Sequence, residues 1–252
     1  MTGELSVSVA NGIASLEFYH PKGNSLPSDL LSKLAESISR LGNDNEVKVI
    51  VLRSKGNGAF CAGASFDELL AIDSHESANT FFKGFGHLIS AIKNCPKFVI
   101  ARVHGKAVGG GVGIIAACDY AIGSKAASIK LSELSIGFGP FVIAPAVIRK
   151  IGISAFSTLT IDTKNWKNSD WAERKGLFNE VVDGDSELDD QVNTLADQLA
   201  SYSAEAMKEI KAMLWEGFEN IETTFEKRAK LSGSLSQSEV TQAILTKFKQ
   251  GS

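Results

Sequence analysis

Two short apolar runs, rich in β-branched residues, constrain the fold of this chain more than any other feature. They are VKVIVLR, residues 47–53, and FVIARV, residues 98–103. Both predict strands buried on two faces, because neither keeps the alternation of a strand with one solvent-facing side. Apolar residues at helical spacing from Ala78 to Ile92 predict a helix between them that ends near Pro96. Strand, helix and strand in this order favour parallel pairing through a crossover helix, and therefore an α/β fold.

The rest of the chain predicts a core followed by helices. From about Ser186 onward, amphipathic segments follow one another and predict a helical C-terminal quarter. We expect a core over residues 1–185 and a C-terminal helical region over residues 186–252. The other elements predicted for the core are a β-hairpin over 5–18 with Asn11-Gly12 at its turn, a helix over 30–41, and short strands over 120–122 and 128–131.

Composition argues against several classes of protein. The chain has 252 residues, of which 44% are hydrophobic and 22% charged, values typical of a globular protein and not of a disordered one. A net charge of −3 offers no basic face, so we expect no nucleic-acid partner. No apolar run is long enough to cross a bilayer and no secretory signal is present, which predicts no membrane contact and a cytoplasmic protein. Cys61, Cys95 and Cys118 lack the spacing of a metal-binding pair, so we expect a reducing compartment and no metal site.

A glycine-containing loop follows each buried run. The loops are GNGAFCAGASFDEL, residues 56–69, and HGKAVGGGVGIIAACD, residues 104–119, and both lead into a helix. Unpaired N–H groups at a helix N-terminus suit a phosphate, a carboxylate or a developing oxyanion. Close packing of helix on sheet would also explain either loop alone, but two such loops after consecutive parallel strands predict a shared site. A dinucleotide fingerprint at residues 111–116 is disfavoured, because its first glycine does not directly follow a strand.

At these loops the sequence resembles the crotonase superfamily, the enoyl-CoA hydratase/isomerase family. Its three motifs resemble AFCAGASFDEL, VHGKAVGGGVGIIAACDYAI and KLSELSIGFGP, in the same order along nearly the whole chain. The resemblance implies a crotonase-like core of ββα-type spiral turns and a C-terminal helical region for oligomerisation. The implied partners are further copies of the chain, in a homotrimer or a dimer of trimers. The implied substrate is an acyl-CoA thioester, and no cofactor is expected beyond the coenzyme A of the substrate.

The resemblance also implies three groups that would act on the thioester. Two are backbone N–H groups, of Ala62 in the first loop and of Gly110 in the second, which would stabilise an enolate oxygen. The third is Glu133, which would exchange a proton with the carbon next to the thioester. The apolar neighbours Leu131 and Leu134 should desolvate the Glu133 carboxyl and raise its pKa. A surface glutamate at a strand end would be the alternative without the two loops.

The sequence departs from the family at Gly113. Hydratases of the family that use two glutamates carry the second one at this position, where it helps to activate water, and glycine cannot do so. Glycine here also occurs in the bacterial methylglutaconyl-CoA hydratase-like subgroup, which the second and third motifs resemble. We therefore expect hydration of a short or branched 2-enoyl-CoA similar to methylglutaconyl-CoA. The alternatives are a 3,2-enoyl-CoA isomerase, in which the single carboxylate of Glu133 moves a proton, and a non-catalytic acyl-CoA-binding or RNA-associated family member.

Further residues are expected to bind the substrate. The resemblance places the adenine of CoA against the backbone of residues 62–64, and His87 could line the acyl site. Phe82, Phe85 and Phe141 are expected to bound the acyl pocket. The other positions implied for substrate binding are Gly63 and Ala64 in the first loop, Lys22 and Gly23 in the HPKGNS turn, and Lys247 and Lys249 in the C-terminal tail.

Overall fold

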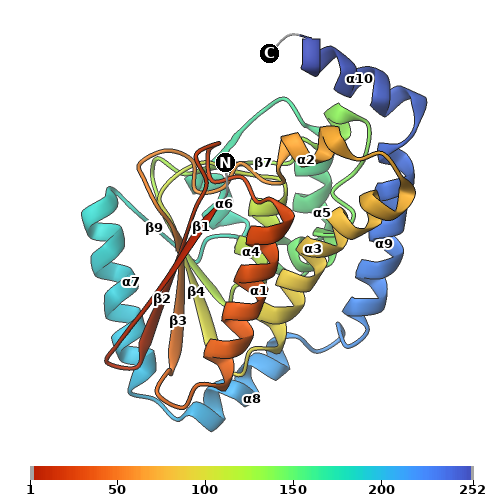
Figure 1. Cartoon of the computed structure of the whole chain (residues 1–252). Helices are drawn as coiled ribbons and strands as arrows, with labels where there is room; N and C mark the ends of the chain where they lie inside the picture. The colour runs from red at the N-terminus through yellow and green to blue at the C-terminus, as the bar shows by residue number, and fades with distance from the viewer. Residues whose placement is uncertain (1–2, 251–252) are drawn as a thin grey trace.

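A six-stranded sheet lies at the centre of the molecule, of which the computed structural model describes residues 3–250 (Figure 1). Its strand order is β1-β2-β3-β4-β6-β9, with β1 and β2 antiparallel and every later pair parallel. The predicted hairpin and the parallel pairing of the two apolar runs are thereby confirmed. The strands are β1 (Glu4–Ala10), β2 (Ile13–Tyr19), β3 (Val49–Ser54), β4 (Phe98–Val103), β6 (Tyr120–Ser124) and β9 (Glu180–Val182).

Helices cover both faces of this sheet. Helices α1 (Ser28–Asn43) and α3 (His75–Asn94) lie on one face, and α7 (Asp185–Ala200) lies on the other (Figure 1). Alternate residues of β3 therefore enter different clusters: Val49 packs with residues of α7, whereas Ile50 joins the larger cluster that includes α1 and α3. Burial on two faces explains why the run that forms β3 is apolar throughout.

A second, three-stranded sheet holds the two glycine-containing loops together. It is formed by β5 (Ala107–Val108), β7 (Ser128–Lys130) and β8 (Lys167–Asn168). Cys61 of the first loop extends it through a parallel bridge to Ala107. Each loop then runs into a short helix, and β7 leads into a 3-10 turn. These elements are α2 (Phe66–Ala71), α4 (Gly110–Ala117) and η1 (Glu133–Ile136).

The helical C-terminal quarter is confirmed, and α9 packs along α3 on the outside of the molecule (Figure 1). A further long helix, α5, occupies a stretch for which the sequence analysis assigns no element. Pro145 lies in the first turn of α5, where its missing N–H costs no hydrogen bond. No helix among residues 3–250 combines the length and apolarity that a membrane crossing needs. The remaining helices are α5 (Ala144–Ile161), α6 (Ser169–Arg174), α8 (Ala204–Leu214), α9 (Ile221–Ser236) and α10 (Glu239–Gln250).

Candidate active site

One cavity of about 160 Å³ brings together residues from both loops, from η1 and from two helices that pack against them. The loops contribute residues 62–64 and 108–110, and η1 contributes Glu133. Helix α3 adds Phe82 and Phe85, while α9 of the C-terminal region adds Ser232. Segments far apart in the sequence therefore meet at one place, as the two loops predict.

Direct backbone contact fixes the two loops relative to each other. The N–H of Val108 donates to the carbonyl of Cys61 at 2.9 Å, and the N–H of Cys61 donates to the carbonyl of Lys106 at 3.1 Å. Gly63 has φ +86°, and a Cβ atom there would lie only 2.8 Å from the carbonyl oxygen of Val108. That same point is 3.6 Å from the nitrogen of Gly110, so only glycine lets the first loop approach the second this closely.

The prediction that Ala62 supplies an oxyanion donor is wrong. Its N–H already donates to the carbonyl of Gly23 at 3.0 Å, which leaves no donor for a substrate. A free amide in the same loop belongs to Ala64. The N–H of Leu26 donates to the carbonyl of Gly63 at 2.8 Å and the N–H of Ser65 donates to the carbonyl of Leu26 at 3.2 Å, whereas the described structure records no acceptor for the N–H of Ala64. The N–H of Gly110, at the start of α4, likewise has no acceptor among the described residues. Ala64 and Gly110 both line the cavity.

The Glu133 carboxyl group lies against the first turn of α4. A Cβ atom at Gly109 would be 2.7 Å from Oε1 of Glu133, so a side chain at 109 would displace the carboxyl. Oε2 is buried and has no hydrogen-bond partner in the described structure. Burial raises the pKa of Glu133 to about 7, although backbone hydrogen bonds partly oppose the shift. A carboxyl with this pKa can both accept and return a proton near neutral pH, as a general acid/base must.

Ile143 occupies the space beside Gly113, the position discussed above for a second carboxylate. A Cβ atom at 113 would lie 2.4 Å from Cγ2 of Ile143, so the isoleucine fills the room that a larger side chain would need. Gly109 is the N-cap of α4, and the N–H of Gly113 donates to its carbonyl at 3.2 Å, so the two glycines lie one turn apart. Glu133 packs on one glycine and Ile143 on the other, which leaves a single carboxyl group bordered by an apolar wall.

The other predicted substrate residues divide into two groups. Gly63, Ala64, Phe82, Phe85 and Phe141 all line the cavity, and Ala62 does so as well despite its occupied amide. Lys22 and Gly23 lie outside the lining: the Lys22 ammonium pairs with Asp67 at 2.6 Å, and Gly23 packs on Ala62. Lys247 is exposed on α10, and the side chain of Lys249 lies outside the described residues.

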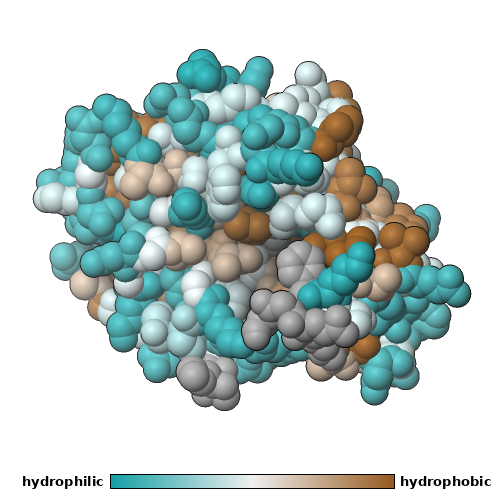
Figure 2. Space-filling model, turned by 90° about the horizontal axis from the view of Figure 1, so that it is seen from above, coloured by the Kyte–Doolittle hydropathy of each residue, from teal (hydrophilic) through white to brown (hydrophobic). Residues whose placement is uncertain are grey.

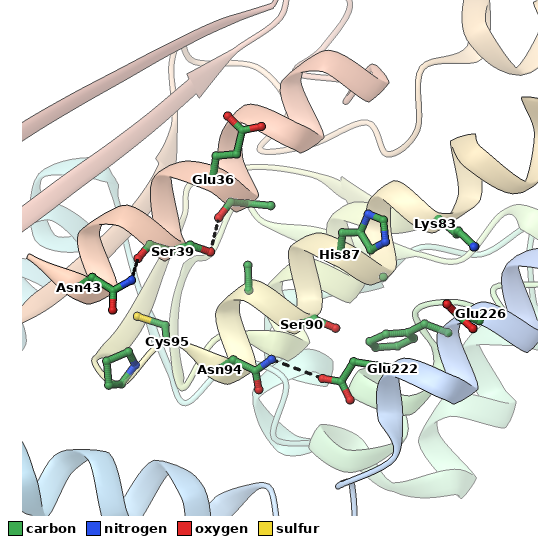
Figure 3. Close-up of a pocket in the computed structure, with 15 residues that line it drawn as sticks. Glu36, Ser39, Asn43, Lys83, His87, Ser90, Asn94, Cys95, Glu222 and Glu226 are labelled. Atoms are coloured by element: carbon green, nitrogen blue, oxygen red, sulfur yellow. Dashed lines mark hydrogen bonds between the residues drawn. The ribbon is translucent and has the colours of Figure 1, made fainter.

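His87 does not line the acyl site as expected. It projects from α3 into a different hollow, of about 780 Å³, between α1, α3 and α9 (Figure 3). Two polar side chains of this hollow bond to each other: Asn94 donates to Glu222 at 3.4 Å. Among the described residues no group of three histidine, cysteine, aspartate or glutamate side chains is placed to hold a metal ion, here or elsewhere.

Several residues of the cavity were not foreseen. Ser232 reaches it from the C-terminal region, and no sequence pattern indicates which side of α9 would face inward. Ile143 and Phe138 come from the apolar stretch after Glu133, whose composition is compatible with any buried role. The small residues Ser232 and Gly233 do indicate that this helix packs closely on a neighbour, since small side chains allow close helix packing, but they do not indicate that Ser232 reaches the cavity.

Comparison with known proteins agrees with this geometry. The enoyl-CoA hydratase/isomerase family matches residues 8–250. The chain belongs to this family. A short-chain-enoyl-CoA hydratase of Clostridium acetobutylicum is 29% identical over 239 residues, which are 94% of this chain and 90% of that protein. The mitochondrial methylglutaconyl-CoA hydratase of Homo sapiens is 31% identical over 172 residues, 66% of this chain and 49% of that protein.

The structure also matches the fold of the enoyl-CoA hydratase/isomerase family. A crystal structure of an enoyl-CoA hydratase from Bacillus halodurans superposes with a TM-score of 0.90 at 22% identity, over 96% of this chain and 99% of that one. The crotonase-like fold that the sequence motifs imply is therefore confirmed.

Proposed function

We propose that this protein is an acyl-CoA enzyme that transfers a proton at the carbon next to the thioester. Glu133 accepts the proton, and the N–H groups of Ala64 and Gly110 stabilise the negative charge that develops on the thioester oxygen. The supporting observation is the convergence of two free amides and one partly protonated carboxyl group in a single apolar cavity. The step is a proton transfer, so it calls for no cofactor beyond the CoA of the substrate.

The geometry favours isomerisation, in which a double bond moves from the 3- to the 2-position of an enoyl-CoA. Glu133 would remove a proton from one carbon and return it to another, which requires only one carboxyl group. Among the described residues of the cavity lining, Glu133 is the sole titratable side chain. Ile143, which fills the space beside Gly113, also leaves no polar group at the second-carboxylate position to orient water. This reverses the ranking that the resemblance to the methylglutaconyl-CoA hydratase-like subgroup implies, in which hydration comes first.

Hydration of a 2-enoyl-CoA is the second candidate. Both relatives described above carry the name hydratase, one of them for methylglutaconyl-CoA, and a single glutamate could still activate a water molecule. A non-catalytic acyl-CoA-binding protein is disfavoured, because a buried carboxyl group without a partner costs stability and calls for a compensating role.

Incubation with 3-hexenoyl-CoA and crotonyl-CoA in deuterated water separates these candidates. Isomerisation predicts that 3-hexenoyl-CoA gains deuterium from the solvent as its double bond shifts, whereas hydration predicts addition of water to crotonyl-CoA. Mass spectrometry reads the gain of deuterium and the gain of water. Glu133→Gln should lower turnover by at least about a thousandfold, because it removes the base, while CoA-thioester binding remains. Turnover of the variant at the wild-type rate would refute the role of Glu133.

Assembly into a trimer, alone or paired, is also part of the proposal. Large hydrophobic side chains remain exposed in the single chain, and apolar residues gather on one side of the surface in Figure 2. Burial of such side chains in a homo-oligomer would remove apolar area from water. The exposed residues include Leu134, Ile153, Ile161, Leu231 and Val240.

A further inference from the structure

Much of the cavity wall is aromatic. Phe82 and Phe85 come from α3, and Phe138 and Phe141 come from the segment after η1. Phe82 and Phe138 form an edge-to-face pair with ring centroids 5.3 Å apart. Phe85 closes against Gly110, where a Cβ atom would lie 2.0 Å from the ring. An acyl group whose thioester oxygen sits on the two amides therefore has these rings among its neighbours.

No cationic side chain belongs to the described lining of this cavity. Its polar side chains are Glu133, Ser132 and Ser232. Nη1 of Arg228 donates to the carbonyl of Phe141 at 3.3 Å. Arg228 lines a separate hollow, however, and does not line this cavity. Lys22 lies outside the lining, and its ammonium group is engaged with Asp67.

We infer that this site selects acyl groups without a terminal charge and rejects acyl groups that end in a carboxylate. A carboxylate among the phenylalanine rings would lose its hydration with no cation to compensate, and the ionised Glu133 would repel it. The inference rests on the proposed function and specifies its substrate class. It also makes methylglutaconyl-CoA, which carries a terminal carboxylate, a poor substrate despite the resemblance to that subgroup.

A matched pair of ligands tests this selectivity without depending on the reaction catalysed. Pentanoyl-CoA and glutaryl-CoA differ in having a methyl group or a carboxylate at the end of the acyl chain. Calorimetric titration at pH 8 should show pentanoyl-CoA binding at least about tenfold tighter than free CoA, and glutaryl-CoA binding no tighter than free CoA. Equal affinities for the two thioesters would overturn the inference.

Turnover provides a second test that separates this inference from the proposed function. In deuterated water, the kcat/KM for deuterium incorporation into crotonyl-CoA should exceed the value for glutaconyl-CoA by about a hundredfold or more. Similar values for both would overturn the selectivity and leave the proposed function standing, whereas absence of both binding and turnover would overturn the proposed function itself.

Phe141→Lys should improve glutaryl-CoA binding and Phe141→Leu should not, because only the lysine supplies a counter-charge.

Discussion

The raised pKa of the Glu133 carboxyl suits its proposed acid/base role but lowers the stability of the folded protein as the pH rises. Because burial raises the pKa of this group to about 7, the folded protein keeps the proton over a pH range in which the unfolded chain has already released it. The unfolded state is thus favoured progressively as the pH rises from about 4.5 to about 7, and the loss of stability is complete above that range. A group selected only for stability would not be buried with an unpaired oxygen.

Glu133→Gln should therefore stabilise the protein at pH 8 while it abolishes turnover. The amide cannot ionise, so the variant should exceed the wild type by about 1 to 3 kcal/mol in free energy of unfolding at pH 8, and by much less at pH 4. Urea unfolding at the two pH values measures this. A stability difference independent of pH would contradict the raised pKa.

Helix α4 links the proposed oxyanion donor, Gly110, to a cluster of cations at its other end. Gly110 begins the helix at the cavity, and the carbonyls near its end accept hydrogen bonds from α5: Arg149 Nη2 bonds Ala116 at 3.1 Å, and Lys150 Nζ bonds Asp119 at 3.0 Å. The Asp119 carboxylate in turn pairs with the buried Lys211 of α8 at 2.8 Å. Cations at a helix C-terminus stabilise it, so this cluster holds in place the helix that presents the Gly110 amide.

Lys150→Met should lower kcat by roughly tenfold to a hundredfold with little change in KM, because a small displacement of α4 misplaces a donor that acts mainly in the transition state. Lys150→Arg should restore much of the loss, since arginine can also donate to the carbonyls. Steady-state kinetics of both variants checks this, with the exposed Lys164→Met as the control. An unchanged kcat for Lys150→Met would show that the helix holds its position without this contact.

At the scale of the whole molecule, the C-terminal region completes the active site by packing on α3. Gly86 makes this possible: a Cβ atom there would lie 2.9 Å from Cβ of Phe225 on α9. Further along the same pair of helices, Gly233 packs near Ala78. Because Ser232 lines the cavity from α9, the docking of this helix on α3 determines part of the substrate site.

Gly86→Ala should lower the free energy of unfolding by about 1 to 3 kcal/mol and weaken binding of a CoA thioester, because the added methyl group pushes Phe225 and α9 away. Gly84→Ala is the matched control on the same helix, since its methyl group would meet only the end of the Leu31 side chain. Denaturant unfolding and calorimetry measure the two effects. Equal behaviour of the two variants would contradict the role of this contact.

The sequence by itself determined the parallel sheet, the hairpin, the helical C-terminal quarter and the two loops of the site. These features depend on local patterns: β-branched runs, helical periodicity and glycines where the chain bends or approaches another segment. The position of Glu133 beside the loops also followed from the order of the three motifs. The residues that make up each pattern or motif lie close together in the sequence, so each one can be recognised along the chain.

Only the tertiary structure decided which groups are free to act. The amide of Ala62 is engaged by Gly23, a residue distant in sequence, and we therefore propose Ala64 as the oxyanion donor in its place. In the same way Ile143, placed by the start of α5, fills the space beside Gly113, and His87 faces away from the cavity. Hydrogen-bond partners and neighbours across the fold are set by packing between segments far apart in the chain, which no local pattern encodes.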